Sequence, residues 1–352
     1  SFWLEALALE IDDKETTTYL ALCDRILELE SEKEEENMAP VNQAINHPMG
    51  RITTALLRRW YHTKPENNAG LTDETRQRFT RLCTPDICRE RHGRVVLARH
   101  VISLFQVDPE WTQHYLLPFF DWAHPENAAG MWQAFLHSPR LHPPLLAALK
   151  PDFLATAKHC DHLGHHQDEY ARFLTFSALD LNTGNIFSKP ELKRAFATLP
   201  SEELATVADA LFCAVNNADD QSASYWTHRV TPFLRNIWPQ STDGMPPEIA
   251  ESFALACVAA GNAFPNALNQ VKEWLRPLSW GSYQITDNIL ETTPSLIQRH
   301  PEEVLVLLDM IIGEQSQTSS KLEQCLIDIQ SEKPDLKSDP RFERLQGMVR
   351  QD

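Results

Sequence analysis

Residues 321–329 read KLEQCLIDI, and their apolar side chains recur with the period of an α-helix. The spacing i, i+3, i+4 and i+7 predicts one apolar stripe along a helix. This stripe consists of Leu322, Cys325, Leu326 and Ile329. Residues 52–60 and 304–311 repeat the pattern, and period-2 runs of β-branched residues, which are typical of strands, are missing. The sequence therefore predicts an all-α protein.

Glycine is scarce in this chain and proline is abundant. The 352 residues include 11 glycines and 23 prolines, whereas average usage would give roughly 25 glycines. Gly-rich phosphate loops, Rossmann turns and tight β-hairpins all need glycine, so these classes are disfavoured. Proline suits the first helical turn, where its missing N–H costs nothing. The prolines that precede helical patterns are Pro48, Pro125, Pro139, Pro151, Pro200 and Pro301.

The helical segments follow one another with short connections, which predicts that successive helices are antiparallel neighbours. We expect an irregular α-solenoid, a repeat-like stack of antiparallel helical hairpins, although no fixed period of a named repeat is present. The predicted domains are an acidic helical segment 1–37, a repeat-like domain 38–240 and a C-terminal helical domain 241–352 that continues the stack. The predicted helices span residues 2–11, 14–35, 49–62, 73–83, 93–105, 109–120, 126–136, 143–160, 165–179, 189–198, 201–216, 220–236, 247–260, 263–275, 301–313, 318–330 and 340–349.

The net charge of −17 argues against nonspecific binding to nucleic acid or to an anionic membrane surface. No run of about 18 apolar residues predicts a membrane span. The chain begins at Ser1 without Met and without signal-peptide features, so we expect a piece of a longer cytoplasmic protein. Its seven scattered cysteines are expected to be reduced thiols packed as small hydrophobes.

A basic segment interrupts this acidic sequence. Residues 51–100 carry 11 Lys and Arg against 5 Asp and Glu. The guanidinium group of Arg matches carboxylates and phosphates. We expect pairing with segment 1–37, which has 12 acids and 3 bases, or between subunits. The alternative is an anion or partner site. Its candidate residues are Arg76, Arg78, Arg81, Arg89, Arg91, Arg94 and Arg99.

Two groups of residues resemble metal sites weakly. His159, His162 and His166 lie in a cluster with Cys160, and an i, i+4 pair of histidines can bind zinc from one helix. Gly164 is expected to break that helix, so a solvated helical corner is the preferred interpretation. Cys83 and Cys88 lie beside His92, but their spacing does not match a zinc knuckle, and buried thiols are expected instead. No metal and no cofactor are predicted.

Aromatic residues gather in two regions. The first is expected to be a helical core, with an aromatic-lined solenoid groove as the alternative. It contains Trp111, Tyr115, Phe119, Phe120, Trp122, Trp132 and Phe135. The second, Trp274, Trp280 and Tyr283, is expected to lie in an irregular loop, where exposed aromatics can anchor a partner.

Phosphate-binding and nucleophile-elbow motifs are absent, so an enzyme is not expected. Residues 47–60 (HPMGRITTALLRRW) and 130–141 (GMWQAFLHSPRL) resemble a helical domain that lies C-terminal to sirtuin-like modules in bacterial anti-phage defence proteins. The resemblance covers about residues 45–180. It implies that an NAD-consuming module lies upstream and that this chain senses a phage component or holds the effector in an assembly. No catalytic residue is carried over, because no Gly-rich nucleotide site occurs here.

These observations lead to three hypotheses. The first is a non-catalytic interaction domain, the sensor or scaffold of a defence protein, with an effector module or a phage protein as its partner and oligomers formed through an attached module. The second is a nucleic-acid or nucleotide-binding module that uses residues 76–99. The third is a helical metal-dependent enzyme centred on the cluster His159, His162 and His166.

Overall fold

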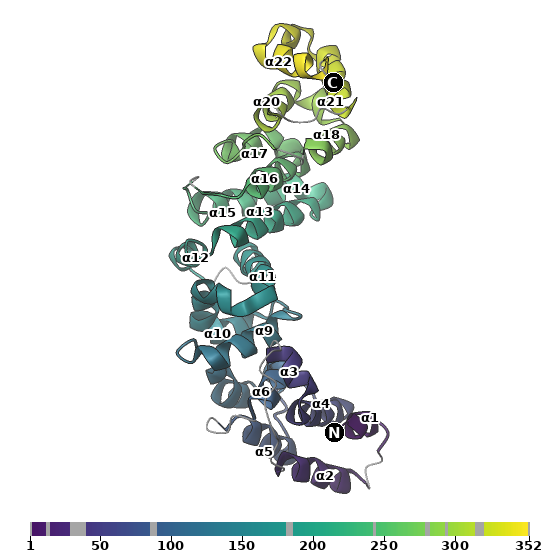
Figure 1. The fold of residues 1–352 in the computed structure, drawn as a ribbon, viewed down its shortest axis with the longest axis vertical. Helices are drawn as coiled ribbons and strands as arrows, with labels where there is room; N and C mark the ends of the chain where they lie inside the picture. Colours follow the sequence, from purple (N-terminus) through teal and green to yellow (C-terminus); the bar gives the residue numbers. More distant parts are fainter. Residues whose placement is uncertain are drawn as a thin grey trace. The chain divides into compact units, whose positions relative to one another are not determined.

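The structure is a computed structural model that describes residues 2–11, 15–28, 40–84, 90–180, 186–241, 244–278, 282–292, 295–313 and 320–350. Within these ranges every regular element is helical, and the only β-type pairing is an isolated bridge between Leu278 and Ile312 (Figure 1). The predicted all-α class is therefore confirmed. The chain divides into two compact units, Ser1–Tyr170 and Ala171–Asp352. This division falls inside the helix predicted for residues 165–179, where the sequence indicated no boundary.

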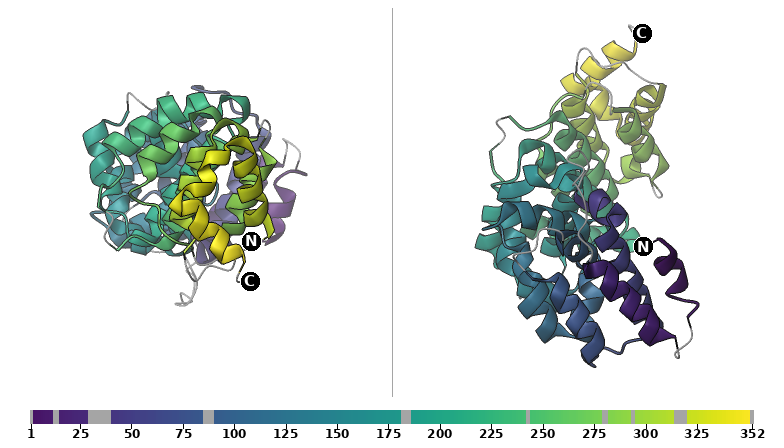
Figure 2. Two further views of the ribbon diagram at one scale, coloured as in Figure 1. Left: turned by 90° about the horizontal axis from the view of Figure 1, so that it is seen from above. Right: turned by 60° about the horizontal axis from the view of Figure 1, so that its bottom comes forward.

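In the first unit α1, α2 and α3 pack against α4, and α6 packs against α3, α4 and α9 (Figures 1 and 2). The elements of this unit are α1 (Phe2–Leu7), α2 (Thr16–Glu28), α3 (Pro40–Asn46), α4 (Pro48–His62), α5 (Asp73–Leu82), α6 (Arg91–Ala98), α7 (Val101–Val107), α8 (Pro109–Trp111), the π-helix η2 (Thr112–Leu116), the 3-10 helix η3 (Leu117–Phe120), α9 (Pro125–Leu136), α10 (Pro143–Ala155), the 3-10 element η4 (Thr156–His166) and the start of α11 (Gln167–Leu179).

In the second unit α13 packs along α16, and α20, α21 and α22 pack against one another near the C-terminus (Figures 1 and 2). After the remainder of α11, its elements are α12 (Lys189–Phe196), α13 (Ser201–Asn216), η5 (Asp219–Gln221), α14 (Ser222–Tyr225), the π-helix η6 (Trp226–Val230), α15 (Thr231–Asn236), α16 (Pro247–Ala259), η7 (Gly261–Ala263), α17 (Phe264–Val271), α18 (Ser282–Glu291), α19 (Leu296–Arg299), α20 (Pro301–Ile311), α21 (Ser320–Glu332), η8 (Pro334–Ser338) and α22 (Pro340–Val349).

Proline starts helices at most of the predicted positions. Pro48, Pro125 and Pro301 are the first residues of α4, α9 and α20, and Pro200 is the N-cap of α13. Pro139 precedes a helix as predicted, and the start predicted at Pro151 is wrong. Pro139 lies in the connection before α10, whereas Pro151 lies inside α10.

Other differences concern short helices and breaks. The sequence missed α3, α18 and α19, and the helix predicted for residues 93–105 is two helices separated at His100, whose φ of −112° is not helical. The helix predicted for residues 143–160 continues as the 3-10 element η4. Gly164 interrupts η4 with φ +57°, as the sequence led us to expect.

The core of the first unit contains several large aromatic side chains. Trp111, Phe120 and Trp132 are buried, which confirms the core interpretation for them, and Trp122 and Phe135 are also buried. Tyr115 is exposed, so the core prediction is wrong for this residue, and Phe119 is partly exposed. The stripe predicted at residues 52–60 lines the buried side of α4.

Gly50 lets α3 and α4 approach closely. A Cβ atom on this residue would lie 1.7 Å from the carbonyl oxygen of Ala44, at the end of α3. No larger residue fits at this position without a shift of the α3 backbone, because real Cβ contacts are never that short.

Candidate functional site

Two of the candidate arginines pair with the acidic N-terminal segment, as the sequence predicted. Arg78 on α5 donates two hydrogen bonds to the carboxylate of Asp24 on α2, at 3.0 and 2.8 Å. Arg81 donates to the Leu27 carbonyl at 3.0 Å and lies 4.0 Å from the Glu28 carboxylate. The bidentate geometry of Arg78 is the favourable arrangement for a guanidinium and a carboxylate. These contacts fasten α2 to α5.

Arg76 pairs with Asp108, a residue that the sequence analysis did not single out. The Asp108 carboxylate is nearly buried and accepts a hydrogen bond from Arg76 at 2.6 Å. It also accepts the backbone N–H groups of Leu71 at 2.9 Å and Trp111 at 3.0 Å. Asp108 is therefore the N-cap of α8 and also holds the segment before α5. The only sequence signal for this role is an Asp before Pro109 at a helix start.

Arg94 is buried within the first unit. Its guanidinium donates to the carbonyl oxygens of Leu82 and Thr84 at 3.2 and 3.0 Å and lies over the Phe119 ring at 4.5 Å. These contacts satisfy carbonyl groups at the end of α5 and add a cation–π interaction. Because it is 2% exposed, Arg94 is a structural residue and does not present its charge to a partner.

The remaining candidate arginines differ in position. Arg89 lies outside the described residues. Arg91 is partly exposed at the start of α6, and Arg99 is exposed between α6 and α7, where it lines a cavity with Arg140. The seven candidates therefore do not form one described basic patch. Arg99 differs from Arg76, Arg78, Arg81 and Arg94 in that the described residues give it no ion pair or buried carbonyl partner.

The histidine cluster packs around a tryptophan. The His159 ring stacks on Trp122 with ring centroids 4.5 Å apart and an interplanar angle of 9°, and His162 lies 6.0 Å from the same indole. His166 is buried, and this burial lowers its pKa. Within the described ranges, no three His, Cys, Asp or Glu side chains are placed to share a metal ion. The observed geometry is a helical corner that covers Trp122.

The second aromatic region differs from its prediction. Trp274 is buried against Trp238 and Phe253, at centroid distances of 6.3 and 5.7 Å, so its predicted exposure is wrong. Its indole packs in the core because residues 264–271 form α17, which covers α16. Trp280 lies outside the described residues, and Tyr283 is exposed on α18.

The cysteines that the structure describes are mostly buried, as predicted. Cys23, Cys83, Cys160, Cys257 and Cys325 are buried, and Cys213 is partly exposed. Burial raises the pKa of Cys23 to about 11 and the pKa of Cys83 to about 12. A thiol with such a pKa is protonated at neutral pH and packs as a small apolar group. Cys88 lies outside the described residues.

A pocket of about 450 Å³ lies where α2, α4 and α5 meet, and we call it the α2–α5 pocket. Its walls include four apolar side chains, Leu20, Leu56, Trp60 and Phe79, each less than a tenth exposed. The volume lies within the range of about 300–1,000 Å³ that is typical of ligand sites. The sequence analysis missed this pocket because its walls come from three separate helices.

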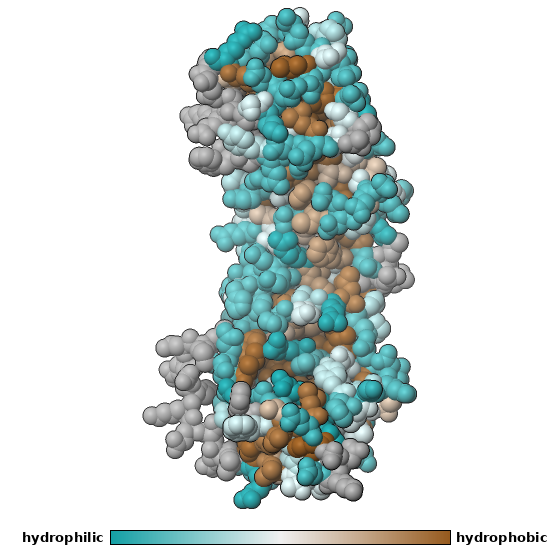
Figure 3. All heavy atoms as spheres, turned by 90° about the vertical axis from the view of Figure 1, so that its right-hand side faces the viewer, coloured by the Kyte–Doolittle hydropathy of each residue, from teal (hydrophilic) through white to brown (hydrophobic). Residues whose placement is uncertain are grey.

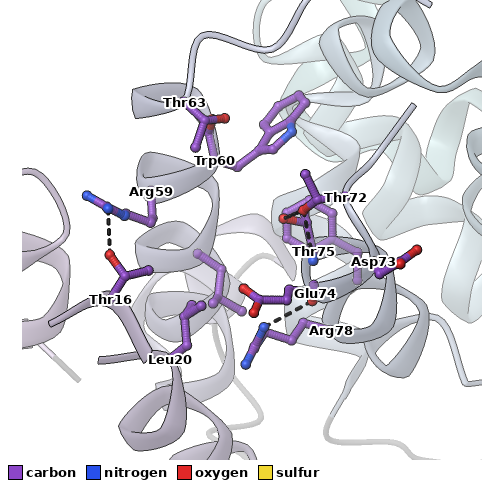
Figure 4. Close-up of a pocket in the computed structure, with 12 residues that line it drawn as sticks. Thr16, Leu20, Arg59, Trp60, Thr63, Thr72, Asp73, Glu74, Thr75 and Arg78 are labelled. Carbon is purple, nitrogen blue, oxygen red and sulfur yellow. Dashed lines mark hydrogen bonds between the residues drawn. The ribbon is translucent and has the colours of Figure 1, made fainter. Parts of the chain in front are cut away.

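Polar residues surround the apolar walls. Thr16 accepts a hydrogen bond from Arg59 at 2.6 Å, and Thr72 caps α5 by accepting the backbone N–H of Thr75 (Figure 4). Asp73 and Glu74 are exposed on the first turn of α5 and line the same pocket. The arrangement is suited to enclosing an apolar group, with a negatively charged edge at α5.

No helix within the described residues is both long and apolar enough to cross a membrane. A comparison of the chain with models of protein families, with curated proteins and with solved structures finds no match.

Proposed function

We propose that this chain is a non-catalytic protein-interaction domain and that the α2–α5 pocket receives an apolar side chain of a protein partner. The observation that carries this proposal is the set of buried apolar walls around a space that the described chain leaves open. Anchor residues that enter such pockets supply most of the affinity of many protein interfaces. The repeat-like stack predicted from the sequence would present this pocket on a helical surface.

The edge of the pocket favours a particular partner. Asp73 and Glu74 are exposed at this edge, whereas Arg78 is paired with the Asp24 carboxylate and Arg59 is buried. The uncompensated charge at the edge is therefore negative. Charge complementarity favours a partner segment in which the apolar anchor is flanked by Lys or Arg.

Apolar side chains are also exposed nearby. Trp3, Leu7 and Leu9 at the first helix and Leu22 on α2 are all exposed, Trp3 to 76%. Figure 3 shows hydrophobic residues at the surface over the N-terminal part of the first unit. Exposed apolar side chains can contact a partner that enters the pocket, so this region is compatible with the proposed function.

The finer proposal is that the chain is the sensor or scaffold part of a larger bacterial anti-phage defence protein. It rests on the resemblance of residues 47–60 and 130–141 to the helical domain that follows sirtuin-like modules. The partner would then be the effector module or a phage protein.

A selection of random dodecapeptides on the wild-type chain tests the pocket. Enriched peptides are expected to share an apolar residue flanked by Lys or Arg. Their affinity, measured by fluorescence anisotropy, should fall about tenfold or more for Leu20→Trp, which fills the pocket, because the anchor can no longer enter. Ala21→Trp is the matched control, since Ala21 is exposed on the same helix and does not line the pocket.

The proposal is wrong if no peptide is enriched, or if enriched peptides bind both variants as they bind the wild type. Thermal melts of both variants show whether Leu20→Trp remains folded. The defence role is tested separately with lysates of infected and uninfected bacteria. A phage or effector protein should be captured by the wild type and Ala21→Trp but not by Leu20→Trp, and capture of none contradicts that role.

A further inference from the structure

A second cavity, of about 390 Å³, lies in the first unit, and we call it the Arg99 cavity. It is formed by the end of α4, the junction between α6 and α7, the end of α9 and the segment that leads to α10. Its lining differs from that of the α2–α5 pocket, because most of it is polar. None of the described residues that line it is Asp or Glu.

The positive charge of the Arg99 cavity comes from two arginines. Arg99 and Arg140 are both exposed and both line the cavity. Neither takes part in the ion pairs found within the described part of the chain. Two guanidinium groups beside a hollow without carboxylates create a positive potential that an anion can neutralise. The planar guanidinium fork matches phosphate oxygens in particular.

Neutral hydrogen-bonding groups complete the polar lining. Ser103, Gln106 and Ser138 contribute hydroxyl and amide groups. His142 accepts the Leu145 backbone N–H through Nδ1 at 3.3 Å, so its neutral ring carries the proton on Nε2. Burial lowers the pKa values of His100 and His142, so both rings are neutral at pH 7. The permanent positive charge of the cavity therefore resides on the two arginines.

Flat rings form another part of the lining. The Tyr61 hydroxyl lies 3.0 Å from Nδ1 of His100, and the two ring centroids are 5.5 Å apart. Burial raises the pKa of Tyr61, and the Ser103 hydroxyl and the Arg140 guanidinium oppose that rise. Tyr61 therefore lies near one of the two arginines, with 38% of its surface exposed. A planar ligand group can stack on such a ring.

We propose that the Arg99 cavity binds a small phosphorylated ligand with a planar ring, that is, a mononucleotide. Arg99 and Arg140 bind the phosphate, the serine and glutamine side chains bind polar groups of the ligand, and Tyr61 stacks on its base. The volume lies in the range of about 300–1,000 Å³ that is typical of small ligands. A nucleic-acid strand is disfavoured by the net charge of −17. This site goes beyond the proposed protein-interaction function and does not depend on it.

Isothermal titration calorimetry with the whole chain tests the proposal. The probes are AMP, GMP, CMP and UMP at low ionic strength, with inorganic phosphate, adenosine and a thymidine oligonucleotide for comparison. At least one mononucleotide is expected to bind about tenfold more tightly than phosphate or adenosine, because it alone uses both the arginines and the ring. Its affinity should fall as salt is raised.

Arg140→Gln and Arg99→Gln should each weaken that binding about tenfold, and both positions are exposed, so neither change removes a core contact. Arg91→Gln is the matched control, because Arg91 lies at the opposite end of α6 from Arg99 and does not line the cavity. Tyr61→Ala should weaken binding of the mononucleotide but leave the affinity for inorganic phosphate unchanged.

The proposal is overturned if no mononucleotide binds at millimolar concentration, or if the losses are equal in Arg140→Gln and Arg91→Gln. It is also overturned if phosphate or adenosine alone matches the best mononucleotide, or if the oligonucleotide binds more tightly than any of them.

Discussion

Replacing Asp108 with Ala should destabilise the first unit by about 3–4 kcal/mol. Loss of the cap on α8 costs about 1 kcal/mol. The buried N–H of Leu71 would be left without its acceptor, which costs about 1–3 kcal/mol. The ion pair with Arg76 contributes only about 0–1 kcal/mol, because the Arg76 side chain is 44% exposed. The two backbone contacts therefore account for most of the expected loss.

Urea unfolding followed by circular dichroism measures this change. With an m-value of about 2 kcal/mol/M, the midpoint should fall by about 1.5–2 M. Hydrogen exchange of peptides that cover residues 66–76 and 105–116 should accelerate, because both contain backbone donors that Asp108 accepts. Arg76→Ala is the matched control and should cost no more than about 1 kcal/mol. The reasoning is refuted if Arg76→Ala costs as much as Asp108→Ala, or if Asp108→Ala costs less than 1 kcal/mol.

Two further predictions concern the packing of α3, α4 and α6. Gly50→Ala should lower the free energy of unfolding by about 1–3 kcal/mol in a thermal melt, because its Cβ atom would overlap the Ala44 carbonyl; an unchanged melting temperature would contradict this. Burial, with the nearby His47 and arginines, lowers the pKa of His92 from 6.5 to about 4. Between these values the unfolded chain binds more protons, so stability is complete above about pH 6.5 and falls by about 2–3 kcal/mol toward pH 4. Urea midpoints across this range should show the decline, and His92→Gln should reduce it; an equal decline in the variant would exclude His92 as its source.

The long, strongly periodic helices could be predicted from the sequence. The stripe at residues 322–329 is buried on α21, and the stripe at residues 52–60 is buried on α4, because the 3.6-residue period alone determines which face is apolar. The seven residues of α3 carry too few apolar positions for such a pattern. In α18, Ile285 and Ile289 are one turn apart and have no longer stripe around them, so propensity alone could not distinguish this helix from a loop.

The candidate site was much less predictable. Segment 1–37 was expected to pair with the basic segment, and the contact between Arg78 and Asp24 confirms this, because unlike charges in excess on two segments attract. The walls of the α2–α5 pocket could not be inferred, since Leu20, Leu56 and Phe79 lie on three helices that meet only through tertiary packing. Trp274 was predicted to be exposed in a loop, but it is buried, because the sequence does not show that a neighbouring helix covers it.

The last turn of α4 contributes to both the α2–α5 pocket and the Arg99 cavity of the first unit. Trp60 lines the α2–α5 pocket and its neighbour Tyr61 lines the Arg99 cavity, with their ring centroids 4.7 Å apart. A ligand that moves this turn on binding to the α2–α5 pocket or to the Arg99 cavity would change the affinity of the other site for its own ligand. Thermodynamic linkage makes that effect reciprocal, with the same factor in both directions. Two adjacent aromatic residues would thus couple the proposed mononucleotide to the proposed protein partner.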